Sequence, residues 1–198
     1  MVDPVATPAT DRGKATRQAL LDAAESLFGT VGYDNASVSE ITRTAGVAQG
    51  TFYVYFADKR QAFSEVVAQV NRTLRRVATE GAAGAPNRIA AEAGGFRAYF
   101  DYVDDHPEVY RIIRDAEFSA PEAALAHYEA WAGPYAHVLA GAQAAGEIVD
   151  GIDPDLLAHL LMGVGEFFGQ RLDRWDDTIG RDEAIRQVLL FVERGLAA

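Results

Sequence analysis

Apolar residues recur at the spacing of an α-helix along almost all of this 198-residue chain, and no segment shows the apolar–polar alternation typical of a strand. The segment 58–80 is the clearest case, because Phe63, Val70 and Leu74 fall on one face of a helix. This pattern predicts an all-α fold with eight or nine helices. We expect them directly after Ser37 and at about 14–29, 49–55, 58–80, 88–104, 107–118, 121–146, 154–175 and 182–196.

Residue types that serve catalysis and metal binding are few in this chain. There is no cysteine, which excludes disulfides, thiolate metal sites and a cysteine nucleophile. The four histidines lack the spacing of metal ligands, and Asp155 with His159 is explained by an ion pair at a helix start. No nucleophile motif is present. We therefore expect no enzymatic activity, no cofactor and no metal site.

The net charge of −11 arises from 29 acidic and 18 basic residues, and a charge of this sign opposes binding to nucleic acid. Its distribution along the chain is uneven. Residues 1–76 hold nine Lys and Arg against eight Asp and Glu, whereas residues 77–198 hold nine Arg against 21 Asp and Glu. The acidity therefore belongs to the C-terminal part, and the first 76 residues are nearly neutral.

The first 13 residues are small, polar and interrupted by proline, which is typical of a disordered tail and not of a signal peptide. No apolar run approaches the roughly 18 residues that a membrane span needs. We therefore expect a soluble, cytoplasmic protein without a membrane partner.

The segment 37–59 contains two short helices joined by a tight turn. Ser37 is placed to cap the first helix, with Glu40 three residues later as its partner in a capping box. Gly46 supplies the turn, and the second helix runs from Gln49 to Tyr55. This arrangement predicts a helix-turn-helix, in which the second helix reads the major groove of DNA.

The second helix of this pair has two chemically different faces. Phe52 and Phe56 share one face at a spacing of four, while Gln49 and Tyr53 fall on another. A short helix rich in Tyr and Phe is usually part of a core when taken alone, but a polar second face favours recognition. The Gln49 amide suits adenine, and tyrosine hydroxyls can reach phosphates.

Residues 14–70 also carry a longer pattern. It consists of Ala45-Gly46-Val47, the run from Gly50 to Phe56, Asp58-Lys59 and Phe63. In this pattern the chain resembles the N-terminal domain of the TetR family of bacterial transcriptional repressors. The resemblance implies that the helix from residue 49 enters the major groove, and that the helix from residue 58 links this head to a ligand-binding, dimerising body. It also implies that Phe52 and Phe56 belong to the core of the head.

The resemblance and the side-chain chemistry together indicate the contacts to double-stranded DNA. The candidates are Ser37, Ser39, Thr42, Arg43, Gln49, Gly50, Thr51, Tyr53, Tyr55 and Lys59. Many relatives have Lys where this chain has Gln49, so Gln49 exchanges phosphate affinity for base reading. For Arg43, a solvated helix face remains the simpler explanation. The expected domains are a tail at 1–13, a helix-turn-helix domain at 14–57, a connecting helix at 58–80, and a ligand-binding and dimerisation domain at 81–198.

The last two expected helices, 154–175 and 182–196, carry apolar stripes wide enough for more than one partner. Gly165 and Gly169 stand four apart in the first of them, which permits close helix approach. The resemblance implies a homodimer in which these two helices form a four-helix interface with their two-fold mates. Ordinary packing within one chain is the alternative.

Aromatic residues concentrate between 96 and 135, in excess of what a simple bundle needs. We expect a mostly apolar pocket for a hydrophobic small molecule among the helices of this region. Its candidate residues are Phe96, Tyr99, Phe100, Tyr110, Arg114, Phe118, His127, Tyr128, Trp131, Glu166, Phe167 and Gln170. Each polar candidate taken singly is explained more simply as a surface or ion-paired side chain.

The sequence thus predicts a homodimeric repressor that a small-molecule effector releases from a palindromic operator. Two alternatives stay open. One is an activator or constitutive regulator of the same fold without a physiological effector. The other is a helical small-molecule-binding protein or enzyme that has lost DNA binding.

Overall fold

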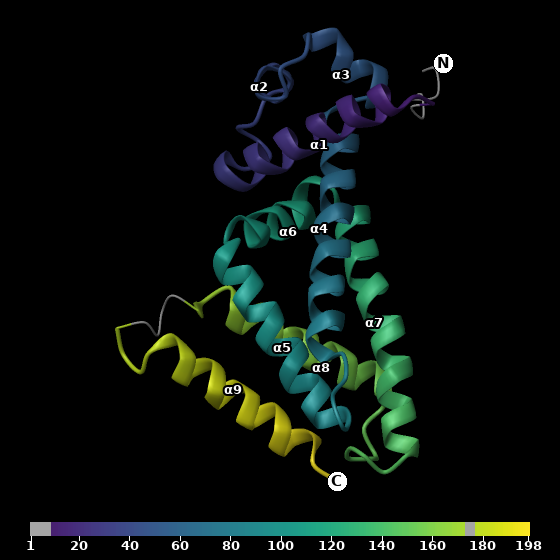
Figure 1. Cartoon of the computed structure of the whole chain (residues 1–198), viewed down its shortest axis with the longest axis vertical. Coiled ribbons are helices and arrows are strands. Elements are labelled where there is room, and N and C mark those ends of the chain that lie inside the picture. Colours follow the sequence, from purple (N-terminus) through teal and green to yellow (C-terminus); the bar gives the residue numbers. More distant parts are fainter. Residues whose placement is uncertain (1–8, 173–176) are drawn as a thin grey trace. The chain divides into compact units, whose positions relative to one another are not determined.

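The computed structural model of the chain describes residues 9–172 and 177–198, and these ranges fold into nine helices without a strand (Figure 1). The all-α prediction is therefore confirmed. No helix within these ranges is long and apolar enough to cross a membrane. The helices are α1 (Asp11–Val31), α2 (Val38–Thr44), α3 (Gln49–Tyr55), α4 (Lys59–Ala82), α5 (Arg88–Asp105), α6 (Glu108–Ser119), α7 (Pro121–Ala144), α8 (Pro154–Gly169) and α9 (Arg181–Leu196).

Helix starts follow the capping residues of the sequence. Ser37 and Glu40 form the expected capping box at α2, and the Asp58 carboxylate accepts the backbone N–H of Gln61 in the first turn of α4. The first helix begins earlier than expected, because Thr10 accepts the N–H of Gly13 and caps α1. The tail prediction is therefore wrong at residues 11–13, and its part at 1–8 lies outside the described residues.

One other boundary differs from the expectation and bears on the expected dimer interface. The helix expected at 154–175 ends at Gly169 as α8, and residues 173–176 lie outside the described part of the chain. α7 is a single helix from Pro121 to Ala144, although Pro134 lies inside it. Prolines stand at or just before the first residue of α6, α7 and α8, where the missing N–H costs nothing.

The helices pack into two compact units, which are described separately. Among the described residues, 9–71 and 108–127 form the first unit, and 72–107, 128–172 and 177–198 form the second. α6 and the start of α7 thus belong with the N-terminal helices, although they come from the middle of the sequence. The domain boundaries expected from the sequence remain predictions.

The first unit has an aromatic core. α1 packs against α2 and α6, and α2 packs against α3. Phe28, Phe52 and Phe63 are all fully buried, and the rings of Phe28 and Phe63 lie 5.0 Å apart in an edge-to-face contact. Phe56 is also buried, with its ring 5.2 Å from that of Phe52. The predicted core positions of Phe52 and Phe56 are therefore confirmed.

In the second unit, α5 packs against both α8 and α9. Its contact with α8 is close at Gly165, where a Cβ atom would lie 3.3 Å from the Phe96 ring. Its contact with the end of α4 is closer still. A Cβ atom on Gly81 would lie 2.5 Å from the Cβ of Ala98 and 2.6 Å from the carbonyl oxygen of Gly94. Only glycine fits this crossing.

A polar network lies inside the second unit between α5 and α7. Glu92 is buried, its carboxylate pairs with Arg88 at 2.7 Å, and it accepts a hydrogen bond from the Tyr135 hydroxyl. Burial raises the pKa of Glu92, although Arg88 and Tyr135 act in the opposite direction. The ion pair with Arg88 and the hydrogen bond from Tyr135 offset part of the cost of burying this carboxylate.

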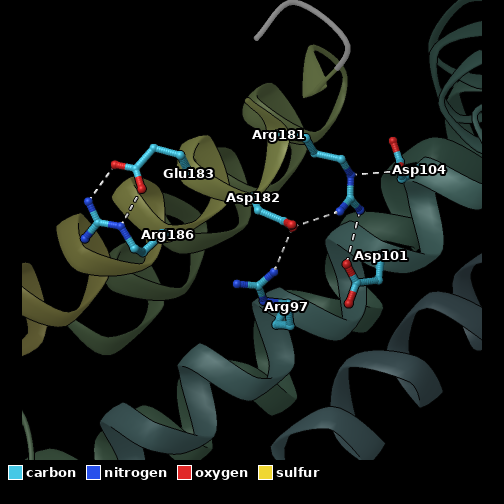
Figure 2. A network of polar contacts seen from close by, with 7 residues as sticks. All are labelled: Arg97, Asp101, Asp104, Arg181, Asp182, Glu183 and Arg186. Carbon is cyan, nitrogen blue, oxygen red and sulfur yellow. Dashed lines mark hydrogen bonds and ion pairs between the residues drawn. The ribbon is translucent and has the colours of Figure 1, made fainter. Parts of the chain in front are cut away.

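Ion pairs connect the start of α9 to α5 (Figure 2). The Arg181 guanidinium lies between two carboxylates of α5, at 3.1 Å from Asp101 and 2.8 Å from Asp104. Arg97 of α5 pairs in turn with Asp182 of α9 at 3.6 Å. Single exposed pairs contribute little to stability, but one guanidinium shared between two carboxylates orients the helix end.

Candidate nucleic-acid interface

The turn between α2 and α3 has the geometry of a helix-turn-helix. α2 ends at Thr44, and its last carbonyls accept the backbone N–H groups of Gly46 and Val47. Gly46 has a φ of +69°, a left-handed conformation that favours glycine. A connection of four residues thus separates α2 from α3, which starts at Gln49. The helix-turn-helix predicted from the sequence is therefore present in the first unit.

The two faces of α3 differ as expected. Phe52 points into the core, whereas Gln49 and Gly50 are exposed and Tyr53 is 55% exposed. Tyr55 and Thr51 are half-buried at the edges of this surface. Val54 is also exposed, and the sequence interpretation missed it. Its spacing of four from Gly50 would have placed it on the same side as that residue.

Some candidate side chains at α2 and its N-cap are exposed, and others are hydrogen-bonded within the helix. Ser39 and Arg43 are exposed. The Ser37 hydroxyl donates to the Glu40 carboxylate at 2.6 Å within the capping box. Thr42 is only 2% exposed, and its hydroxyl donates to the carbonyls of Val38 and Ser39. We therefore remove Thr42 from the candidate DNA contacts, because its hydroxyl already donates to backbone carbonyls of its own helix.

Lys59 is also engaged within the first unit. Its amine donates to the carbonyl oxygen of Tyr33 at 2.7 Å and to that of Ala36 at 2.9 Å, and it lies 4.3 Å from the centre of the Tyr33 ring. The DNA contact expected of Lys59 would have to compete with these bonds. The structure thus gives Lys59 a role that the sequence did not suggest, which is to hold the segment between α1 and α2.

Comparison with known proteins identifies this part of the chain. Residues 20–66 match the family model described as "Bacterial regulatory proteins, tetR family". Residues 20–66 therefore form a DNA-binding domain of the TetR family. The matched residues run from the middle of α1 through α2 and α3 into α4, and so include the entire candidate interface.

Relatives of the TetR family cover different shares of the chain. A regulator of Bacillus subtilis, "Uncharacterized HTH-type transcriptional regulator YdgC", is 36% identical over 66 residues, which are 33% of this chain and 34% of that protein. The "A-factor receptor protein" of Streptomyces griseus is 27% identical over 162 residues, which are 81% of this chain and 55% of that one. The chain therefore spans between a third and about half of these curated relatives.

Solved structures of the TetR family share the fold over nearly the full length. The transcriptional regulator FadR of Bacillus subtilis, solved in complex with stearoyl-CoA, superposes with a TM-score of 0.76 at 19% identity. The superposition covers 90% of this chain and 98% of FadR. At this level of identity the likeness shows the fold alone.

The residues expected in a ligand pocket fall into both units. Within the second unit, the structure brings several of them together. The Phe100 ring lies 5.0 Å from that of Phe168, and the Tyr99 ring lies 6.3 Å from that of Trp131. Tyr128 donates to Glu166 at 3.2 Å, and Gln170 lies 3.4 Å from the same carboxylate. Phe96 is buried beside Phe100, whereas Phe167 is exposed under the Arg171 guanidinium.

The other pocket candidates belong to the first unit. Tyr110 is half-buried and Arg114 is exposed on α6. Phe118 is 83% exposed at the end of α6, and an apolar side chain so exposed lines no closed pocket within this unit. His127 is buried on α7. These four residues stay candidates only as proposals.

The buried His127 gives the chain a testable pH dependence. Burial lowers its pKa to about 4, below the value of about 6.5 for an unfolded chain. Between these values the unfolded state binds a proton that the folded state does not, so stability falls as the pH falls. From about pH 7 to about pH 5.5 we expect this group to remove about 1 kcal/mol of the free energy of unfolding.

Urea unfolding at several pH values measures this contribution. The variant His127→Gln should lack it, so its free energy of unfolding should depend less on pH than that of the wild type over this range. His137→Gln, which replaces an exposed histidine of the same helix, is the matched control and should keep the wild-type slope. Equal slopes in all three proteins would contradict a buried neutral His127.

Proposed function

We propose that this chain is a cytoplasmic, homodimeric transcriptional regulator that binds a palindromic DNA operator and responds to a hydrophobic small molecule, most simply as a repressor. The observation that supports DNA binding best is the division of α3 into a buried aromatic face and an exposed face of Gln49, Gly50 and Tyr53. A seven-residue helix seated on the core by Phe52 is a rigid platform for these side chains. The nearly neutral charge of residues 1–76 agrees with this placement.

The decisive experiment is selection of DNA by the full chain. A random duplex library, and separately the duplex upstream of its own gene, would be bound to the protein and sequenced after enrichment. A palindrome with half-sites about one helical turn apart is the expected product, with affinity that falls steeply as salt rises. Failure to enrich any sequence over the starting library would overturn the proposal in favour of a small-molecule-binding protein without DNA function.

Tyr53 provides the sharpest test of the interface. Tyr53→Ala should weaken binding to the selected duplex about tenfold, because a base or phosphate contact contributes roughly 1–3 kcal/mol. Fluorescence anisotropy at fixed salt measures the effect. Tyr53→Phe separates the hydroxyl from the ring, and Val138→Ala, an exposed apolar position on α7, is the control. Wild-type affinity in Tyr53→Ala would remove this residue from the interface.

The effector proposal rests on the aromatic cluster of the second unit. Phe96, Phe100 and Phe168 form its apolar part, and Tyr128 with Glu166 supplies polar groups on neighbouring helices. A relative in fold, FadR of Bacillus subtilis, holds stearoyl-CoA. Stearoyl-CoA is therefore a suitable first probe, with coenzyme A alone as the control that lacks the apolar chain. Release of the selected duplex by the acyl compound only would support a hydrophobic effector.

The dimer proposal rests on an exposed apolar stripe of α8. Leu156, Leu160, Gly163 and Phe167 follow one another at helical spacing, and nothing lies within 4 Å of a Cβ atom built on Gly163. On α9, Phe191 is exposed and Gly195 is equally open. Apolar side chains in such a row favour burial against a second copy. α8 and α9 correspond to the helices at 154–175 and 182–196 for which the sequence analysis expects dimerisation.

A further inference from the structure

Helices from distant parts of the sequence meet at the corner between α1 and α2, which we define as residues 32–36. From α6, the Asp115 carboxylate accepts the backbone N–H of Tyr33 at 2.9 Å. From α4, the Lys59 amine donates to the carbonyls of Tyr33 and Ala36. Ala36 directly precedes the N-cap residue of α2, so the corner determines where α2 begins.

α6 also contacts the end of α1 that leads into this corner. Arg111 donates to the carbonyl oxygen of Thr30 at 2.5 Å, in the last turn of α1. That turn contains no basic residue of its own, so α6 supplies the positive charge that a helix C-terminus favours. Gly29 lets the two helices approach, because a Cβ atom there would lie 2.6 Å from the Cβ of Glu108.

Gly32, the residue that follows α1, also lies against α6. Gly32 has a φ of +87°, and a Cβ atom on it would lie 3.2 Å from the Oδ2 atom of Asp115. The carboxylate therefore sits directly against the glycine turn while it accepts the N–H of the next residue. This bond joins residues that lie 82 positions apart in the sequence.

We propose that Asp115, supported by Arg111, is a positioning residue for DNA binding: α6 holds the corner, and the corner sets the position of α2 and of the recognition helix α3. This inference rests on the DNA-binding function proposed above. α6 lies in the chain between α5 and α7, both of which contribute residues to the second unit. Like α4, which contributes residues to both units, α6 links the corner to the second unit along the chain.

Charge and geometry make opposite predictions for Asp115. Loss of a negative charge in the first unit would by electrostatics alone strengthen binding to DNA. Asp115→Asn removes the charge but keeps an oxygen that can accept the N–H of Tyr33. Asp115→Glu keeps the charge but moves the carboxylate by one methylene group. The two variants therefore separate the charge of residue 115 from its position.

The experiment measures two properties of the full chain and its variants. Amide hydrogen exchange of Tyr33 reports the bond itself and needs no DNA. Affinities for the selected duplex and for a scrambled duplex of equal length report positioning. We expect Asp115→Glu to speed exchange of the Tyr33 amide and to lower the affinity for the selected duplex about tenfold. Its affinity for the scrambled duplex should not change. Asp115→Asn should stay within about threefold of the wild type in both properties.

Asp34→Ala is the matched control, because Asp34 is an exposed carboxylate in the same corner. It should leave hydrogen exchange of the Tyr33 amide unchanged and should not lower the affinity for the selected duplex. Wild-type affinity in Asp115→Glu despite faster exchange would overturn the positioning role, as would unchanged exchange at Tyr33. A wild-type chain that selects no duplex would instead overturn the DNA-binding proposal, and the exchange measurement keeps the two failures distinct.

Discussion

Replacement of Phe52 by alanine is expected to lower the free energy of unfolding by about 3–5 kcal/mol, the usual cost of deleting a buried phenylalanine ring. Phe52 is fully buried, and its ring contacts that of Phe56 at 5.2 Å. α3 has no side-chain cap at its N-terminus and is only seven residues long, so it depends on this anchor for its position. Chemical denaturation followed by circular dichroism measures the loss.

Val54→Ala is the matched control, because Val54 is an exposed apolar residue of the same helix. Its effect on the free energy of unfolding should stay within about 0.5 kcal/mol. If Val54→Ala changed affinity for the selected duplex and not stability, the two faces of α3 would be separated by experiment. A Phe52→Ala variant as stable as the wild type would show that the helix is not seated by this ring.

The part of the site that the sequence predicted depends on local spacing. The capping box needs only Ser37 and Glu40 three residues apart, and the two faces of α3 follow from a spacing of four between Phe52 and Phe56. Both features are decided within a turn or two of helix. They were therefore visible without knowledge of any other part of the fold.

The features that the sequence did not predict depend on distant partners. The sequence predicts that Lys59 contacts DNA, but its amine donates to the carbonyl of Tyr33, which lies 26 residues earlier in the chain. The contact of Asp115 with Tyr33 spans a still longer separation. Periodicity describes which face of a helix is apolar and says nothing of which polar groups meet across helices. A single sequence therefore reveals the surface of α3 but not the contacts that hold its position.

Replacement of Leu160 by glutamate is expected to convert a dimer into a monomer and to weaken binding to the selected duplex about 100-fold or more. Leu160 is 54% exposed at the centre of the α8 stripe, and a charge there would have to be buried without a partner in the dimer. Two linked recognition helices bind a palindrome roughly 100-fold to 10,000-fold better than one, because the second contact is intramolecular. Light scattering coupled to gel filtration, together with anisotropy, measures both effects.

Leu125→Glu makes the same substitution at a leucine of similar exposure, 58%, on α7 in the first unit. It changes the net charge of the chain as Leu160→Glu does, so it controls for the added negative charge. Only the variant on α8 should become monomeric, and the difference between their affinities isolates the contribution of dimerisation. A Leu160→Glu protein that remains dimeric would place the contact between copies elsewhere on the molecule. A monomer that still binds the palindrome as well as Leu125→Glu would show that one recognition helix suffices, which the nearly neutral charge of residues 1–76 argues against.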